Sequence, residues 1–247
     1  MSPLRIAILI HTDDPKPRRM MRESFEHIFE SIAPGSKLDF FNLLLSPNLP
    51  TLTEEPTYDL VILGGTTYPP KPGVAWMQNL KDFEHKLNSV YTKQKVMGIC
   101  LGHQTLAILN GSIMGYSGEP ELAVTDIPLT PAGQEFFSNL TINGRSSLRI
   151  HEFHQRYITS PPSGFKELAE NCQILLSDDD RIITFQGHPE MSAALMEELL
   201  LSPTSKESGY TSAINSEEAK SALLKRANLD HDGIAIFKSI VDWVKRP

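Results

Sequence analysis

The sequence places one cysteine, Cys100, in a setting that favours chemistry, the pentapeptide Gly98-Ile99-Cys100-Leu101-Gly102. The apolar run VMGI leads into it and the helix-like HQTLAIL follows, so the thiol is predicted at a sharp corner between a strand and a helix. Glycines on both sides remove the Cβ atoms that would collide in so tight a turn. A helix N-terminus favours the thiolate and offers free backbone N–H groups to a developing oxyanion. The pattern therefore predicts a cysteine nucleophile, with a buried structural cysteine as the alternative.

A cysteine nucleophile needs a base, and His188 in the segment ITFQGHPEMS is the histidine best placed to serve. This segment ends an apolar strand and turns at Gly187. Glu190 follows the histidine by two residues, so its carboxylate can orient the imidazole and support its charged form. His103 lies on the helix after Cys100 and is expected to pack there. The alternative for the segment is a structural turn with an exposed histidine before an acidic helix N-terminus.

The segment His151-Glu152-Phe153-His154 suggests a metal site, but its spacing argues against one. The zincin motif HExxH has one more residue between its histidines and lies on a helix, whereas this segment is strand-like. The pattern offers no convincing third ligand, so no metal is expected. Surface or packing roles are assigned to the remaining histidines, which are His11, His27, His85 and His231.

The elements that must position these residues alternate in the first half of the chain. Short apolar runs predict strands over 4–11, 37–44, 58–65 and 95–100. Apolar residues at helical spacing predict helices over 20–32, 74–90 and 101–111, and the apolar stripe of the second is expected to be Val74, Met77, Leu80, Phe83, Leu87 and Val90. Alternating strands and helices are typical of a parallel sheet that is covered on both faces.

The second half of the chain has a different order. Successive strands with polar turns are predicted over 121–130, 147–160, 166–178 and 180–187, followed by a helix over 191–201. A polar segment of unassigned role covers 203–219, and helical patterns close the chain. The predicted fold class is therefore α/β, a flavodoxin-like, open and mostly parallel sheet with helices on both faces. An added antiparallel β section completes this three-layer α/β/α arrangement.

Composition sets further limits. The chain has 247 residues and 40% hydrophobic content, and no Gly/Ser/Pro-rich linker divides it. A single domain over 1–247 is predicted, with a core over about 4–201 and a C-terminal helical extension over 202–247. Lys and Arg total 23 against 30 Asp and Glu, a net charge of −7 without a basic block, which argues against nucleic-acid binding.

Compartment is inferred from two further features. The apolar run LRIAILI is too short for a signal-peptide core or a membrane span, so no membrane association is expected. Cys100 and Cys172 do not make a disulfide framework, which favours a reducing, cytoplasmic location.

Taken together, GICLGHQ and the later FQGHPE resemble the class I glutamine amidotransferases of the Cys-His-Glu type. The resemblance covers roughly residues 4–201. It implies that Cys100 attacks the γ-carboxamide of glutamine to form a γ-glutamyl thioester, that His188 acts as general base and acid, and that Glu190 orients the histidine. Ammonia and then glutamate would leave the site.

The resemblance also implies roles for other residues. Gly65, in the loop LGGTTY, and Leu101 match the backbone N–H donors of the oxyanion site. Gln104 matches a residue that contacts the bound glutamyl group. Phe153 and His154 fall in the loop that reads the α-amino and α-carboxylate groups. The family's glycine pair is usually followed by proline, whereas Thr66-Thr67 stand here, which leaves the loop's shape and substrate choice open.

Several functions remain open on these grounds. The chain has no room for a synthetase domain and no GxxxxGK[ST] P-loop, so no cofactor is expected. The favoured function is cysteine-dependent hydrolysis of a γ-glutamyl amide, in glutamine, a γ-glutamyl peptide or a glutathione conjugate. The first alternative is a glutaminase subunit that feeds ammonia to a separate synthetase partner and carries an apolar docking patch. The others are a non-catalytic flavodoxin-like binding protein and, disfavoured because the acid directly follows the histidine, an α/β-hydrolase.

Overall fold

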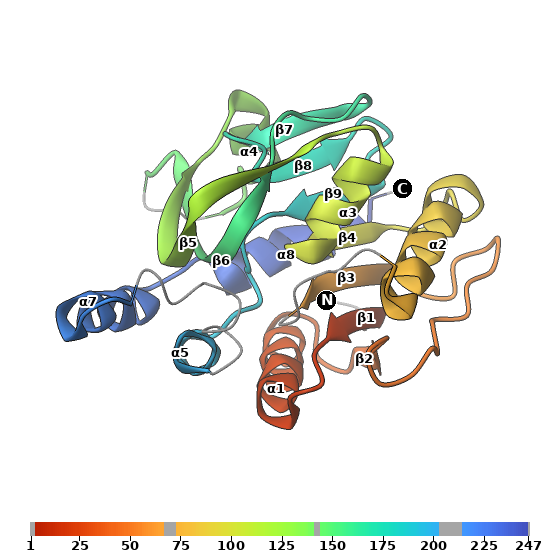
Figure 1. The fold of residues 1–247 in the computed structure, drawn as a ribbon. Helices are drawn as coiled ribbons and strands as arrows, with labels where there is room; N and C mark the ends of the chain where they lie inside the picture. Colours follow the sequence, from red (N-terminus) through yellow and green to blue (C-terminus); the bar gives the residue numbers. More distant parts are fainter. Residues whose placement is uncertain (1–2, 67–72, 141–143, 203–213, 247) are drawn as a thin grey trace.

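A computed structural model describes residues 3–66, 73–140, 144–202 and 214–246 of the chain. Within these ranges a seven-stranded sheet has the order β2-β1-β3-β4-β9-β8-β7, and β5 and β6 form a separate two-stranded sheet (Figure 1). The strands are β1 (Arg5–His11), β2 (Lys37–Phe41), β3 (Leu60–Thr66), β4 (Val96–Ile99), β5 (Met114–Pro128), β6 (Ser147–Ile158), β7 (Phe165–Ala169), β8 (Ile174–Ser177) and β9 (Ile182–Phe185).

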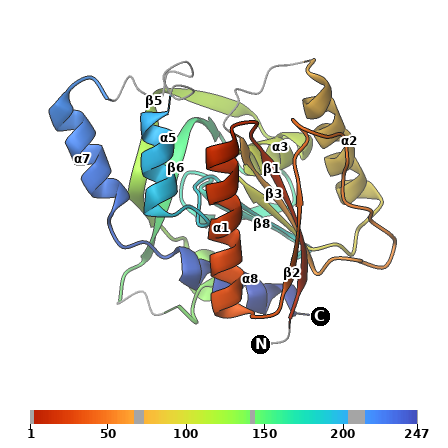
Figure 2. The ribbon, with the colours of Figure 1, turned by 90° about the horizontal axis from the view of Figure 1, so that it is seen from below.

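Helices cover both faces of the large sheet (Figure 1, Figure 2). They are α1 (Pro15–Ile32), α2 (Ala75–Ser89), α3 (Leu101–Leu109), the short α4 (Pro131–Phe136), α5 (Ala193–Leu201), α7 (Glu217–Ala227) and α8 (Gly233–Val244). Successive strand residues point to opposite faces. Ile8 and Ile62 accordingly pack with α1, α5 and α8, whereas Leu9 and Leu63 pack with α2 and α3. The predicted three-layer α/β fold is confirmed.

The central strands β2, β1, β3, β4 and β9 run parallel, and β8 and β7 add an antiparallel edge. Parallel strands bring their carboxyl ends to one edge of the sheet, and open α/β sheets bind ligands outside that edge. The carboxyl ends of β3, β4 and β9 therefore meet there. Gly65 lies at the end of β3, and Cys100 and His188 follow β4 and β9.

Several predicted elements differ from the structure. The strand predicted over 121–130 is β5, which begins at Met114. The single strand predicted over 166–178 is a hairpin of β7 and β8, because Asn171 and Cys172 both adopt a left-handed backbone with φ of 56° and turn the chain. The helix predicted to start at residue 20 starts at Pro15 instead. Its first turn accommodates Pro15 and Pro17, since the first N–H groups of a helix have no intrahelical acceptor, and Asp14 caps the N–H of Lys16.

The described part of the C-terminal extension packs into the main core. The ring of Phe237 on α8 meets Phe25 and Phe29 of α1 edge-on, with centroids 6.1 and 5.6 Å apart. Trp243 is fully buried, and its indole N–H donates to the carbonyl of Asp180. The division into one domain with an extension stays a prediction, but α8 is part of the same apolar cluster as the sheet. No helix in the described ranges is both long and apolar enough to cross a membrane.

Candidate active site

Cys100 lies at the corner between β4 and α3 with φ of 50° and ψ of −96°, a strained backbone for a residue with a side chain. Its own N–H donates to the carbonyl of Phe185 on β9 (2.8 Å). The two glycines are needed for close contact: a Cβ on Gly98 would lie 2.8 Å from the carbonyl carbon of Gly102, and one on Gly102 would lie 2.2 Å from the Leu63 oxygen. The corner thus presents the thiol at the start of α3.

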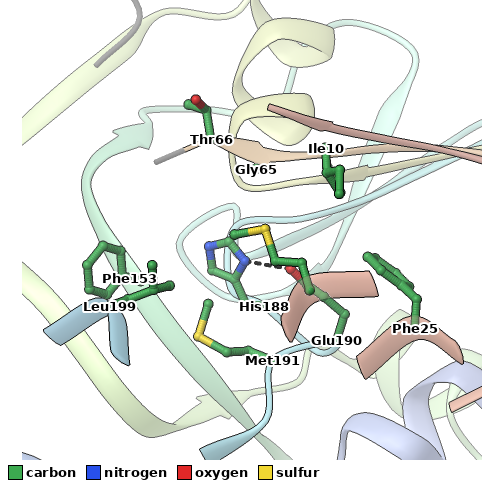
Figure 3. Close-up of a pocket in the computed structure, with 11 residues that line it drawn as sticks. Ile10, Phe25, Gly65, Thr66, Phe153, His188, Glu190, Met191 and Leu199 are labelled. Atoms are coloured by element: carbon green, nitrogen blue, oxygen red, sulfur yellow. Dashed lines mark hydrogen bonds and ion pairs between the residues drawn. The ribbon is translucent and has the colours of Figure 1, made fainter. Parts of the chain in front are cut away.

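His188 and Glu190 form a buried pair in the turn between β9 and α5. His188 Nδ1 lies 2.8 Å from Glu190 Oε1 (Figure 3). The backbone N–H of His188 donates to the carbonyl of His151 on β6 (2.7 Å), and the Ser24 hydroxyl on α1 donates to the Glu190 carbonyl. Strand β6 and helix α1 therefore hold the backbone of this turn, and Glu190 holds the imidazole.

Electrostatics set His188 apart from its buried neighbours. Burial by itself lowers the pKa of His188, but the charge of Glu190, and then the charge and hydrogen bond of Cys100, raise it well above its usual range. Burial lowers the pKa of His11 to about 4, and of His103 and His151 to about 3. A charged imidazole beside a thiol favours the thiolate. The geometry and charges of this pair therefore suit a cysteine–histidine nucleophile.

The predicted oxyanion donors lie beside these groups. A Cβ on Gly65 would lie 3.0 Å from His188 Cε1 and 3.7 Å from Cys100 Cβ, so the Gly65 backbone passes next to both. Leu101 is the first residue of α3, where backbone N–H groups have no intrahelical acceptor. Thr66 ends β3 and its hydroxyl donates to the carbonyl of His11 (2.8 Å). Thr67, the other residue in place of the usual proline, lies outside the described residues.

The predicted substrate contacts separate into two groups. Gln104 lies one turn after Cys100, and its amide donates to the Arg156 carbonyl (3.1 Å) and to Gln186 Oε1 (3.2 Å). Phe153 lines the same small cavity as His188 (Figure 3). The next residue of β6, His154, faces the other side of the strand. The structure thus brings the Phe153 side chain to the pair, but not that of His154.

His154 instead contacts two carboxyl groups, one of which the sequence analysis missed. His154 Nε2 lies 2.9 Å from Glu152 Oε2 and 3.8 Å from Glu121 Oε2. Glu121 lies opposite His154 in the antiparallel pairing of β5 and β6. The pattern of residues within one strand cannot predict this pairing. These donors lie within 4.8 Å of one another and have the types that bind a divalent metal. Burial raises the pKa of Glu152, and a protonated carboxyl group can contact the imidazole without an ion. The absence of a metal centre stays a prediction.

Two spaces adjoin the candidate site. A cavity of about 20 Å³ is enclosed by His188, Glu190, Phe153 and their neighbours, which is room for about one water molecule. A groove of about 840 Å³ runs along α3 from Leu101 and Gln104 toward Ile108 and lies between α3 and α2. A glutamyl side chain is too large for the first space, whereas the groove is large enough for one and is lined by Leu101, the residue after Cys100.

Glu84 lines this groove and was not singled out by the sequence. It is buried, with only 1% of its surface exposed, and accepts a hydrogen bond from the Thr105 hydroxyl. Burial raises its pKa to about 8, opposed in part by that hydrogen bond, so the carboxyl group is mostly protonated at neutral pH. The helical pattern over 74–90 gave no sign of this, because a charged residue type is normally expected on the solvent side.

Comparison with known proteins identifies the family to which this geometry belongs. The family model for glutamine amidotransferase class-I matches residues 43–204. The chain belongs to this family. It is 33% identical over 216 residues to the glutamine amidotransferase-like protein chyE of Penicillium rubens, covering 86% of this chain and 89% of that protein.

Other family members differ in their named activities. One is a subunit of the glutamine-hydrolyzing GMP synthase of Sulfurisphaera tokodaii, 31% identical over 139 residues, which are 54% of this chain and 68% of that protein. Gamma-glutamyl peptidase 2 of Arabidopsis thaliana is 22% identical over 205 residues, 79% of each chain. The crystal structure of a glutamine amidotransferase from Thermotoga maritima superposes with a TM-score of 0.70 and 20% identity, covering 98% of this chain and 99% of that one. Membership of the class I glutamine amidotransferases supports glutamine amide hydrolysis in general terms and leaves the substrate open.

Proposed function

We propose that the protein hydrolyses a γ-glutamyl amide bond through a γ-glutamyl thioester on Cys100. One observation carries this proposal: in a class I glutamine amidotransferase, the charged His188–Glu190 pair lies against a thiol at a strained strand-to-helix corner. The pair supplies a proton donor, and the helix N-terminus supplies N–H groups for an oxyanion.

The proposed reaction has two halves. The Cys100 thiolate attacks the γ-carbonyl carbon, and the carbonyl electrons move to the oxygen, where the N–H groups of Gly65 and Leu101 stabilise the charge. The C–N bond then breaks, and the amine leaves with the proton of His188. Water loses a proton to His188 as it attacks the thioester, which releases glutamate and restores the thiolate. Glu190 keeps the imidazole oriented in both halves.

Glutamate release by the purified protein tests this proposal. The substrates are glutamine, glutathione and a glutathione S-conjugate, and Cys100→Ala and Cys172→Ala are assayed beside the wild type. Strong release from the γ-glutamyl peptides and little from glutamine would make the protein a γ-glutamyl peptidase. Release from none of them, with or without cell extract, would favour the non-catalytic binding protein instead.

The second candidate is a glutaminase subunit that supplies ammonia to a separate synthetase. Exposed apolar side chains at the groove favour it: Ile108 and Met114, which line it, are 41% and 38% exposed. The relative in Sulfurisphaera tokodaii is named as a subunit of a GMP synthase. This candidate predicts weak glutaminase activity alone, an increase when cell extract is added, and loss of that increase in Met114→Glu.

A further inference from the structure

We propose that the segment 231–233, which leads into α8 and includes its first residue, positions the His188–Glu190 pair. The sequence assigned His231 only a surface or packing role. The effect on catalysis that we infer rests on the proposed function. The contacts themselves do not depend on it. Three contacts carry the proposal. They are made to the edge of β6, to the ring of His151 and to the backbone of Pro189.

The first contact is a pair of hydrogen bonds to the edge of β6. The backbone N–H of Asp232 donates to the Arg149 carbonyl (2.8 Å), and Asp232 Oδ2 accepts the Arg149 N–H (2.7 Å). Arg149 and His151 are two residues apart on the strand, so their backbone groups point to the same edge. The His151 carbonyl on that edge accepts the N–H of His188 (2.7 Å). Asp232 and His188 thus occupy adjacent positions on one strand edge.

The second contact is between rings. The imidazoles of His231 and His151 pack with centroids 4.8 Å apart and planes inclined by 59°. Burial lowers the pKa of both groups, so the rings meet uncharged at neutral pH. His151 is completely buried, and its carbonyl is the one that holds His188. His231 therefore packs against the residue that holds the proposed base.

The third contact is backbone against backbone. Gly233 begins α8, and a Cβ at this position would lie 2.2 Å from the carbonyl oxygen of Pro189. Pro189 is the residue between His188 and Glu190. The start of α8 therefore lies directly against the middle of the proposed catalytic turn.

The segment itself is firmly anchored. Arg145 Nη2 lies 2.8 and 3.0 Å from the two carboxylate oxygens of Asp232. On the C-terminal side, Phe237 and Trp243 bury α8 in the core. The segment lies beyond residue 204, where the family match ends, so this support comes from a part of the chain that the family model does not describe.

The test uses Gly233→Ala in the full chain. Alanine is the better helix former, so helix propensity alone predicts no loss. The collision with the Pro189 carbonyl is expected to displace the turn and lower kcat roughly 10- to 100-fold, with KM little changed. A second readout needs no substrate: the rate at which iodoacetamide alkylates Cys100 between pH 5 and pH 9. The alkylation rate near neutral pH is expected to fall, because a displaced imidazole activates the thiol less.

Two substitutions of His231 separate its ring from its hydrogen bond. His231 Nδ1 accepts the N–H of Gly233 (3.2 Å). His231→Asn keeps an acceptor for that N–H but removes the ring. His231→Phe keeps a ring against His151 and removes the acceptor. We expect near-normal kcat and alkylation rates in His231→Phe, and lower values of both in His231→Asn. The reverse order would show that the ring contact does not position the pair.

Val241→Ala is the matched control for stability. Val241 is fully buried on α8, so its truncation should lower Tm while leaving kcat and the alkylation profile unchanged below melting. The proposal fails if Gly233→Ala behaves like the wild type in both readouts, or if Val241→Ala changes them equally. If the wild type releases no glutamate, the proposed function fails, and the alkylation profiles still decide the positioning role.

Discussion

Gly102 lies so close to Leu63 that a Cβ on the glycine would lie 2.2 Å from the leucine carbonyl oxygen. Helix α3 thereby begins in direct contact with the backbone of β3, the strand that continues into Gly65. The distance between the Cys100 thiol and the backbone of Gly65 depends on this contact, because Cys100 lies two residues from Gly102 and Gly65 lies two residues from Leu63. Glycine at position 102 is a requirement of the site as well as of the turn.

Gly102→Ala should therefore reduce both stability and activity. Inserting a methyl group into a packed backbone contact costs about 1–3 kcal/mol. The displacement of α3 should also lower kcat. Urea unfolding followed by circular dichroism measures the first effect and glutamate release the second. Gly111→Asn is the control: its φ of 97° makes the substitution strained, but the open space around its Cβ position means that nothing collides, so stability should fall while kcat is retained. Equal effects of the two substitutions would contradict the contact argument.

Cys100→Ala should abolish turnover, whereas Cys172→Ala should leave it within about two-fold. Burial, followed by the hydrogen bond and charge of Glu167, raises the pKa of Cys172 to about 12, so that thiol stays protonated and unreactive at neutral pH. Glutamate release at saturating substrate provides the measurement. A similar loss in both variants would remove the assignment of Cys100 as nucleophile.

Glu190→Gln should reduce kcat less than His188→Ala, because a positioned imidazole still acts as a base without its orienting partner. The pH dependence gives a sharper signature. Glu190 contributes to raising the pKa of His188, so its removal lowers that pKa and the imidazolium is lost at lower pH. The alkaline limb of kcat/KM should accordingly move to lower pH in Glu190→Gln. An unmoved limb, or a larger loss of kcat than in His188→Ala, would contradict these roles.

Glu84 should make the protein less stable as pH rises. Its pKa is about 8 when folded and 4.5 as a free side chain, so between these values the unfolded state binds fewer protons and stability falls with pH. Full ionisation would cost a few kcal/mol. Glu84→Gln should flatten this dependence, measured by urea unfolding at pH 5 and pH 8. Glu23→Gln, at an exposed site on α1, is the control and should retain the wild-type slope.

The sequence predicted the parts of the site that lie within short motifs. Cys100 with its glycines, and His188 with Glu190, are each contained in a few consecutive residues, and the order of strands brings the two motifs to one sheet edge. The contact between Glu121 and His154 depends instead on the register of two strands. The contact between His231 and His151 depends on how the last helices pack. No local pattern encodes such contacts between distant segments, and the sequence analysis missed both.

Helix α2 illustrates the same limit for the fold. Of its predicted apolar stripe, Leu80, Phe83 and Leu87 are buried as expected. Val74 and Val90, at the two ends, are 38% and 55% exposed, since the neighbouring elements do not extend over the helix termini. Periodicity identifies the buried side of a helix. It does not say how far the covering structure reaches.

The packing of α8 against α1 has a consequence for the order in which the described interior is assembled during synthesis. Phe237 and Trp243 fill the interior beneath strands made from the first half of the chain, and they leave the ribosome after every other described element. A nascent chain that already contains Cys100, His188 and Glu190 still lacks this part of its interior. Native packing around the thiol is therefore expected only after translation has passed residue 243, which delays a reactive cysteine until the chain can fold around it.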